Sequence, residues 1–263
     1  MNETVKHANS KTVTPIHKGI SVIFPAFNEA ENIEESVKQC VSAMSPIFSS
    51  LEIIVVNDGS KDETANIINR LSVEEPSVVA IHHEGNLGYG AALRSGIDRA
   101  SKDFIFFTDA DLQFNLDEIT HLSKWIQDWD IVAGYRAKRA DPIHRRINAA
   151  GWNILVRLVL GLKVTDIDCA FKLFRREVFD TIRMETVGAM INTEILSLAN
   201  LHGMKIKEVP VSHFPRTAGT QTGANIRVIC KALMELFAIS HKLRTRIRTA
   251  KAYNISIPKP AVD

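Results

Sequence analysis

Short apolar runs alternate with segments of helical periodicity through the first 115 residues, and this alternation constrains the fold more than any other feature. The apolar runs cover residues 20–24, 51–56, 78–82 and 104–108. The segments with apolar residues at helical spacing are 29–44, 62–71 and 89–100. Strands that alternate with helices are typical of a parallel sheet covered on both faces. We therefore predict a doubly wound, Rossmann-like α/β domain with a mostly parallel sheet.

The second half of the chain continues with less regular elements. Further strands are expected at 130–134, 171–174 and 206–214, and further helices at 147–160, 190–201 and 222–243. These elements predict one domain over residues 19–243, with a nucleotide half at 19–115 and an acceptor half at 116–243. We expect residues 1–18 to form a disordered lead and residues 244–263 a basic, flexible tail.

Composition indicates a soluble globular chain in a reducing compartment. Cys40, Cys169 and Cys230 lie far apart without a CxxC pair, so neither a disulfide framework nor a zinc site is indicated. The N-terminus lacks the apolar core of a signal peptide, and no stretch approaches the roughly 18–20 apolar residues of a membrane span. We expect a cytoplasmic protein that can contact a membrane surface. Its basic residues carry no recognisable nucleic-acid-binding motif, so no nucleic-acid partner is expected.

Two carboxylates, Asp109 and Asp111, directly follow the apolar run at 104–108, with the amide of Gln113 two residues further on. Placing both acids at a strand end costs repulsion and desolvation unless a cation balances them. A hard divalent ion with oxygen ligands, Mg²⁺ or Mn²⁺, is the natural partner and would also hold substrate phosphates. A solvated turn is the alternative interpretation.

Polar residues also follow the first two strands, at 25–29 (Pro-Ala-Phe-Asn-Glu) and 57–60 (Asn-Asp-Gly-Ser). Ligands of doubly wound sheets bind beyond the carboxyl ends of the strands, so these segments should meet Asp109 and Asp111 at one edge. Phe27 would then pack beside a base, with Asp58 near base or ribose, although an Asx-turn also explains Asp58. Gly88 would let the chain pass close to a nucleotide, or serve only as a turn residue.

Basic and acidic side chains gather in the expected acceptor half. The basic ones after the strand at 130–134 are Arg136, Lys138, Arg139, Arg145 and Arg146. They would neutralise a diphosphate or an anionic acceptor, and a solvated basic face is the alternative. Arg216 is a further candidate for pyrophosphate, because a guanidinium grips phosphate bidentately. Asp166 and Asp168 would act as a base or pair with the basic loop, and a solvent-facing acid is the simplest interpretation of Glu194.

The ordered set of motifs resembles the inverting family 2 glycosyltransferases of GT-A fold, and within them the polyprenol-phosphate (dolichol-phosphate) mannosyltransferases. The motifs that carry the resemblance are residues 25–29, 55–60, 86–88, 109–113, 134–136, 145–153, 166–175, Glu194, 208–211 and 216–219. Together they cover residues 19–243.

The resemblance implies a role for each matching residue. The nucleotide would be contacted by Pro25, Phe27, Glu29 and Asp58. The metal would be held by Asp109, Asp111 and Gln113, with Ala110 near the donor. The donor or its phosphates would be contacted by Arg136 and Arg216. The acceptor would be met by Arg145, Arg146, Asn153 and Glu194.

The implied reaction moves a hexose, mannose or glucose, from a nucleotide-diphospho-sugar such as GDP-mannose or UDP-glucose to a polyprenyl phosphate, with inversion. A phosphate oxygen needs no general base, whereas a hydroxyl of a glycan or small metabolite would need one, for which Asp166 or Asp168 is the candidate. A catalytically silent, nucleotide-sugar-binding scaffold is the alternative of another class.

Overall fold

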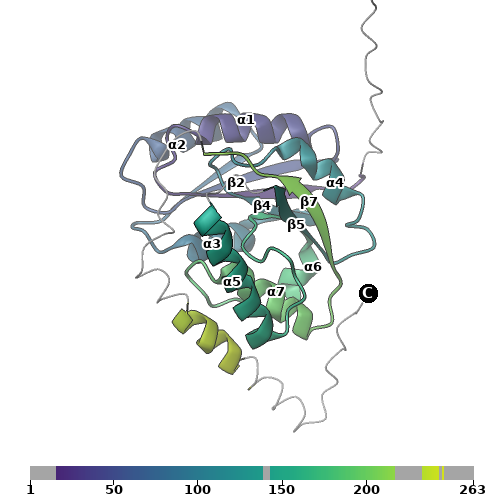
Figure 1. Ribbon diagram of the computed structural model, residues 1–263. Helices are drawn as coiled ribbons and strands as arrows, with labels where there is room; N and C mark the ends of the chain where they lie inside the picture. Colours follow the sequence, from purple (N-terminus) through teal and green to yellow (C-terminus); the bar gives the residue numbers. More distant parts are fainter. Residues whose placement is uncertain (1–15, 139–142, 217–232, 243–244, 246–263) are drawn as a thin grey trace, which may run out of the picture.

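The computed structural model describes residues 16–138, 143–216, 233–242 and 245, and it gives no side chains at 138–150 (Figure 1). Its strands are β1 (Ile20–Ala26), β2 (Leu51–Asn57), β3 (Val78–His82), β4 (Phe104–Thr108), β5 (Ile131–Lys138), β6 (Phe171–Arg175) and β7 (Ile206–Ser212). Its helices are α1 (Ile33–Met44), α2 (Thr64–Glu74), α3 (Tyr89–Arg99), η1 (Leu116–Glu118), α4 (Ile119–Ser123), α5 (Ile143–Leu160), α6 (Arg176–Thr181) and α7 (Ile191–Leu201). An unlabelled helical segment covers 233–242.

All seven strands form one sheet in the order β3-β2-β1-β4-β6-β5-β7. β1, β2, β3 and β4 are parallel neighbours, and β5 and β7 form a second parallel pair. β6 runs antiparallel between β4 and β5 and joins the two groups. The predicted single α/β domain with a mostly parallel sheet is confirmed, while the direction of β6 was not predicted.

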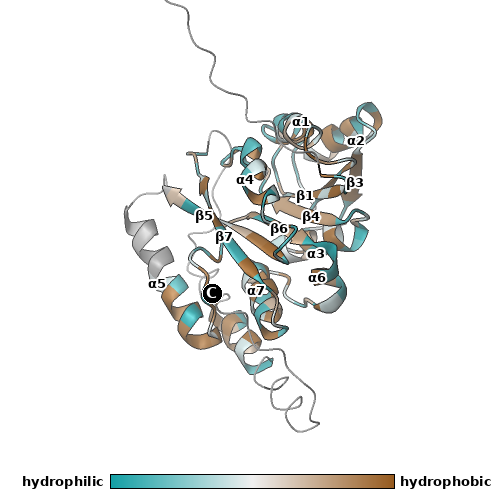
Figure 2. Cartoon of the chain, turned by 90° about the vertical axis from the view of Figure 1, so that its right-hand side faces the viewer, coloured by the Kyte–Doolittle hydropathy of each residue, from teal (hydrophilic) through white to brown (hydrophobic). Residues whose placement is uncertain are grey.

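The strands are apolar on both sides because helices cover both faces of the sheet. In β1, Val22 and Phe24 belong to one core cluster, together with residues of α1, α2 and α4. Ile23 belongs to the other cluster, which includes residues of α3, α5, α7 and the segment 233–242. The sheet therefore appears as a hydrophobic layer between helices in Figure 2. This burial leaves the carboxyl edge of the sheet as the place for polar groups.

Several predicted boundaries shift. α1 begins at Ile33 rather than at 29, because Asn32 donates its side-chain amide to the Glu29 carboxylate (2.8 Å) and closes a turn before the helix. β5 continues to Lys138, and β7 ends at Ser212. Of the predicted helix at 222–243, only 233–242 lies within the described residues, and the predicted lead and tail fall almost entirely outside them.

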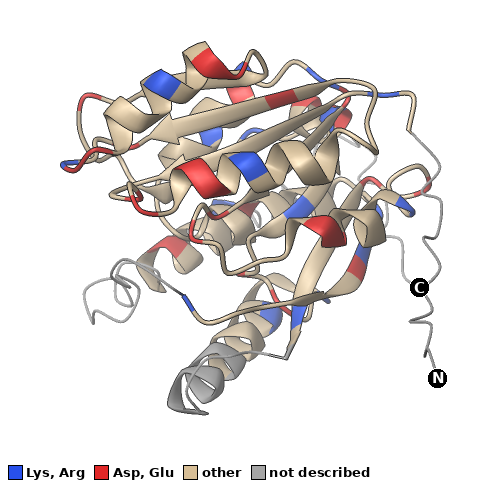
Figure 3. Cartoon of the chain, turned by 90° about the horizontal axis from the view of Figure 1, so that it is seen from above, with Lys and Arg blue, Asp and Glu red and all other residues tan. Residues whose placement is uncertain are grey.

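Two of the three cysteines, Cys40 and Cys169, are buried free thiols, as the sequence predicts, and Cys230 lies outside the described residues. Among the described residues on the side seen in Figure 3, acidic and basic residues are interspersed along the helices. Within the described residues, no helix has the length and apolar character that crossing a membrane requires.

A close approach between α3 and β1 makes Gly96 sensitive to substitution. A Cβ at Gly96 would lie 2.4 Å from the Cγ2 atom of Ile23. We expect Gly96→Ala to lower the free energy of unfolding by about 1–3 kcal/mol through overpacking. Gly151→Ala in α5 is the matched control, because a Cβ there meets nothing within 4 Å. It should leave stability unchanged or raise it by up to about 1 kcal/mol, and urea denaturation measures both variants.

Candidate active site

The segment after β4 places two carboxylates at the carboxyl edge of the sheet. Asp109 is partly buried and Asp111 is 7% exposed. Leu112 adopts a left-handed conformation (φ 60°), and the Asp111 carboxylate accepts a hydrogen bond from the Gln113 amide nitrogen at 3.2 Å. The Ala110 carbonyl accepts from the Ser36 hydroxyl at 3.0 Å, which fixes the segment to α1. The turn after β4 is therefore held from both sides.

Gln113 connects this turn to the chain that follows β7. Its side-chain amide donates to the Phe214 carbonyl at 2.9 Å, and the Phe214 amide donates back to the Gln113 carbonyl at 2.8 Å. This pairing brings Arg216 to the carboxylates. Arg216 forms an ion pair with Glu29 and lies 3.8 Å from the Asp111 carboxylate. Four residues predicted to bind the donor or its metal thus lie together, although they come from distant parts of the sequence: Glu29, Asp111, Gln113 and Arg216.

The two acids at the end of β4 carry more negative charge than this environment stabilises. Burial, followed by the charge of Asp111, raises the pKa of Asp109 to about 7. Burial also raises the pKa of Asp111, against the opposing effect of Arg216. Raised carboxylate pKa values of this kind fit a site whose compensating cation is divalent.

The donor set available for that cation is small. Within the described residues, no three His, Cys, Asp or Glu side chains cluster as a metal site. Asp109 and Asp111, with the Gln113 amide oxygen, would supply part of an oxygen shell, and this chemistry suits Mg²⁺ or Mn²⁺ that completes its shell with substrate phosphates. The residues present fit such a shared site.

Asp58 organises the neighbouring loop. It is buried, and its carboxylate accepts hydrogen bonds from the Leu87 and Gly88 amides at 2.9 and 2.8 Å. Gly88 has φ 102°, and a Cβ there would meet the Val187 carbonyl at 2.5 Å. The positive φ of Gly88 fits its interpretation as a turn residue. The Asx-turn interpretation of Asp58 is wrong, because its carboxylate binds a distant loop, and the Ser60 amide donates instead to the Asn57 side chain at 3.0 Å. The predicted nucleotide contacts of Asp58 and Gly88 remain predictions.

His83 belongs to the same network and was missed by sequence reasoning. Its Nδ1 lies 2.7 Å from the Asp58 carboxylate, and its Nε2 lies 2.9 Å from the Ser95 hydroxyl of α3. It follows β3 directly, so its position after a strand was the available signal. At the same edge of the sheet, Pro25 of β1 is paired with Val56 of β2, and Phe27 is 38% exposed. The exposed ring of Phe27 is available to pack against a ligand.

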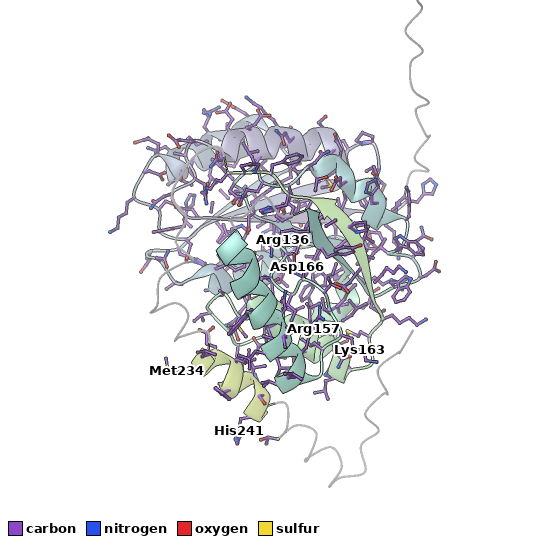
Figure 4. The ribbon with its side chains drawn as sticks, viewed as in Figure 1. Arg136, Arg157, Lys163, Asp166, Met234 and His241 are labelled. Atoms are coloured by element: carbon purple, nitrogen blue, oxygen red, sulfur yellow. The ribbon has the colours of Figure 1, made fainter. Side chains whose placement is uncertain are left out.

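Arg136 and Asp166 form a bidentate ion pair within the predicted acceptor half (Figure 4). Arg136 Nε and Nη2 each donate to the Asp166 carboxylate at 2.7 Å, and the Arg136 amide donates at 3.2 Å. Burial opposes the charged guanidinium, but the Asp166 carboxylate outweighs burial and holds the pKa of Arg136 above its ordinary value. Of the two roles left open for Asp166, the structure supports pairing with the basic residue. Asp168, on the same loop, is exposed.

Lys172 fixes the loop that carries Asp166, and sequence reasoning did not identify it as a functional residue. It is fully buried, and its ammonium donates to the Ile167 carbonyl at 3.0 Å and to the Cys169 carbonyl. Burial lowers its pKa. A lysine within an otherwise apolar strand could have drawn attention to this position. It did not, because alternation along β6 also fits a lysine that faces solvent. Lys172 orders the segment that positions Asp166.

The predicted acceptor residues separate into two groups. The side chains of Arg145 and Arg146 lie outside the described residues, and only their backbone is seen in α5. Asn153 is buried and donates to the Thr165 carbonyl at 3.2 Å, next to Asp166. Glu194 is 2% exposed, so its interpretation as a solvent-facing acid is wrong.

The reason for the burial of Glu194 is local. Its carboxylate accepts from the Glu185 and Thr186 amides at 2.9 and 2.8 Å, and Lys242 lies 3.4 Å away. Glu194 therefore holds the loop that packs on α3, where the Val187 carbonyl accepts from the Gly90 amide at 2.9 Å. Its predicted acceptor contact remains a prediction.

The charges at the end of β4 generate a stability prediction. The metal-free folded state retains the Asp109 proton at higher pH than the unfolded chain, whose Asp pKa is about 3.9. The free energy of unfolding should therefore fall between about pH 4 and about pH 7. We expect Asp109→Asn to remove this loss and to raise the melting temperature of the metal-free protein at pH 8. Thermal denaturation of both proteins at about pH 4 and at about pH 8 measures the effect.

The same variant should respond differently to metal. Mn²⁺ at about a hundred times its dissociation constant should stabilise the unaltered protein by about 2.7 kcal/mol and Asp109→Asn far less. Asp128→Asn, a change at an exposed acid, is the control for both measurements. A control that matches Asp109→Asn would contradict the assignment of the site.

The Arg136–Asp166 pair generates a second prediction. Asp166→Asn leaves a guanidinium that is 12% exposed without its charged partner, which should cost about 3–5 kcal/mol. Replacing both residues, with Arg136→Met and Asp166→Leu, should restore part of that stability, because no unpaired buried charge remains. Chemical denaturation of the two variants checks this order. A double variant less stable than the single one would show that packing, rather than charge, dominates.

Comparison with known proteins shows which family this chain belongs to. The sequence model of the family described as Glycosyl transferase family 2 matches residues 21–183. An undecaprenyl-phosphate 4-deoxy-4-formamido-L-arabinose transferase of Salmonella choleraesuis (strain SC-B67) is 31% identical over 218 residues, which cover 82% of this chain and 65% of that protein. The chain thus spans just under two thirds of the length of the curated relatives that it matches.

Solved structures show the same fold at lower sequence identity. The mannosyltransferase PcManGT from Pyrobaculum calidifontis, in complex with GDP-Man and Mn²⁺, has a TM-score of 0.63 and 19% identity, over 88% of this chain and 67% of that chain. Glucosyl-3-phosphoglycerate synthase from Mycobacterium tuberculosis, in complex with UDP, has a TM-score of 0.64 and 20% identity, over 85% and 80% of the two chains. The fold is that of GT-A glycosyltransferases, and by its sequence the chain belongs to glycosyl transferase family 2.

Proposed function

We propose that the protein is a metal-dependent glycosyltransferase that moves a hexose from a nucleotide-diphospho-sugar to a polyprenyl phosphate, with inversion at the sugar C1. The observation that carries the proposal is the convergence of Glu29, Asp111 and Arg216 beside Asp109. Carboxylates for a divalent cation and an arginine for phosphate are what a diphosphate leaving group requires.

The donor half follows from this arrangement. Asp109, Asp111 and Gln113 would hold Mg²⁺ or Mn²⁺, which when bound neutralises charge that develops on the departing diphosphate. Arg216 would stabilise the same charge from the other side. The exposed ring of Phe27 would pack against the base. We propose GDP-mannose and UDP-glucose as the first donors to test.

The acceptor half favours a nucleophile that is already ionised. Asp166 is held by both guanidinium contacts of Arg136, so protonation of Asp166 would disrupt a buried ion pair. An oxygen of a lipid phosphate attacks without a general base, and this supports polyprenyl phosphate over a hydroxyl acceptor. The Salmonella relative carries undecaprenyl phosphate in its name. The reaction would take place at a membrane surface, which we propose to be the cytoplasmic face.

A transfer assay tests the proposal. We expect labelled hexose from GDP-mannose or UDP-glucose to appear on undecaprenyl phosphate in the presence of Mn²⁺, and excess EDTA to stop the transfer. Asp111→Ala should remain folded and lose activity by at least about a hundredfold, and Arg216→Met should lose about 10²–10³ in kcat. Asp128→Ala is the matched acidic control.

The other outcomes of the assay separate the competing functions. Transfer that persists undiminished in EDTA would remove the metal from the mechanism. Donor binding by calorimetry without turnover on any acceptor would identify a nucleotide-sugar-binding scaffold. Transfer to a soluble hydroxyl compound, with none to undecaprenyl phosphate, would overturn the acceptor assignment and leave the donor site intact.

A further inference from the structure

Two helices of the predicted acceptor half carry large exposed apolar side chains on their outer face, in addition to the apolar side chains that pack into the core. In α5, Ile154 is 56% exposed and Leu158 is 80% exposed. Arg157, on the same helix, donates its Nε to the Val164 carbonyl at 2.9 Å, and Asn153 is buried. A surface helix in water normally places polar and charged side chains on its outer face.

The segment 233–242 repeats the pattern. Met234 is 67% exposed and Phe237 is 63% exposed. Lys242 lies 2.6 Å from Glu185 and 3.4 Å from the buried Glu194, so its charge is satisfied against the protein. Leu236 and Ile239 pack into the core. The segment is thus apolar on its inner face and again on part of its outer face.

The two helices lie next to each other at one end of the molecule in both Figure 1 and Figure 2. Residues of both belong to the same core cluster, which includes Val156 and Leu236. We call the exposed residues Ile154, Leu158, Met234 and Phe237 the apolar end face. A group of large exposed apolar side chains on neighbouring elements is typical of a surface that binds a membrane or another protein.

The apolar end face is connected to the acceptor side of the site. Asn153, adjacent to Ile154 in the sequence, donates to the Thr165 carbonyl, and Asp166 is the next residue. Figure 4 shows Arg136 and Asp166 toward one end of α5, with Arg157 and Lys163 toward the other. The hydrogen bond of Asn153 therefore links the helix that carries Ile154 and Leu158 to the loop that carries Asp166.

Charge around the apolar end face favours an anionic bilayer over other occupants. Lys163 and His241 are exposed at its edge. The sequence that directly follows the segment 233–242 carries further basic residues: Arg244, Arg246, Arg248 and Lys251. Apolar side chains that enter the headgroup region, with cations beside them, are the combination that holds peripheral proteins on anionic lipid.

We propose that the apolar end face docks on the surface of an anionic lipid bilayer and so presents the acceptor side of the site to lipid-embedded phosphate. The docking rests on side-chain exposure and charge. Its purpose rests on the proposed function, and the two are tested separately.

Vesicle flotation tests the docking directly. The full chain is mixed with phosphatidylcholine vesicles that contain or lack phosphatidylglycerol. We expect binding that requires phosphatidylglycerol and weakens in high salt. The double variant Leu158→Gln/Phe237→Gln should bind at least about tenfold more weakly, because two apolar side chains no longer enter the lipid. Val73→Gln is the matched control, since Val73 is 85% exposed on α2 at the other end of the molecule, and it should bind normally.

Two results would overturn the docking proposal. One is vesicle binding by the double variant equal to that of the unaltered chain. The other is a change of oligomeric state by light scattering in the double variant with vesicle binding retained, which would make the face a contact between copies of the chain. Circular dichroism confirms that the exposed substitutions leave the fold intact.

An activity assay separates the docking proposal from the proposed function. With a short-chain polyprenyl phosphate in solution, the double variant should transfer sugar at the normal rate, and it should lose transfer only to vesicle-embedded acceptor. If the unaltered chain transfers nothing to either acceptor, the proposed function fails. Flotation still decides the docking in that case.

Discussion

Repulsion between the two carboxylates after β4 is the constraint around which the site is organised. Asp109 and Asp111 lie where the sheet excludes much of the solvent, and burial raises both of their pKa values. The protein brings Arg216 to this point through the pairing of Gln113 with Phe214. Arg216 balances only part of the charge, because it also pairs with Glu29. The remaining imbalance is what a divalent cation with a diphosphate would relieve.

A layer of buried, fully engaged charges supports that site. Arg136 and Asp166 satisfy each other, Lys172 donates to carbonyls of the adjoining loop, and Glu194 accepts from two backbone amides. Each of these charges would be costly in the interior without its partners. Each also fixes a loop that would otherwise sample many conformations. The polar interior therefore gives the rim a defined geometry before any ligand arrives.

Much of the donor side was predictable from sequence because it depends on local patterns and one general rule. Apolar runs locate β1, β2 and β4. Parallel strands of a doubly wound sheet place their carboxyl ends at one edge, so Asp58, Asp109 and Asp111 were expected at the same edge of the sheet. The location of Arg216 followed from the resemblance, and the structure explains it through Phe214.

The parts that could not be predicted depend on contacts between distant segments. The alternation in β6 is compatible with a solvent-facing Lys172, whereas in the structure the residue is buried against the loop of Ile167 and Cys169 and near Asn192 of α7. Glu194 sits among apolar residues of α7, but its partners lie in a loop that local patterns do not position. The direction of β6 was equally open, because a five-residue strand carries no record of which neighbours it will pair with.

The antiparallel direction of β6 has a consequence for how such a protein changes over time. Thr108, the last residue of β4, is paired with Phe171, the first residue of β6, and β5 runs parallel to β4. The chain therefore leaves the carboxyl edge of the sheet after β5 and returns to the same edge before β6. Insertions, deletions or exchanges within this excursion, which contains α5, leave the register of every strand unchanged. Under the proposed function, the fold could accordingly acquire a new acceptor by replacing the segment between β5 and β6, while the strands proposed to serve the donor stay as they are.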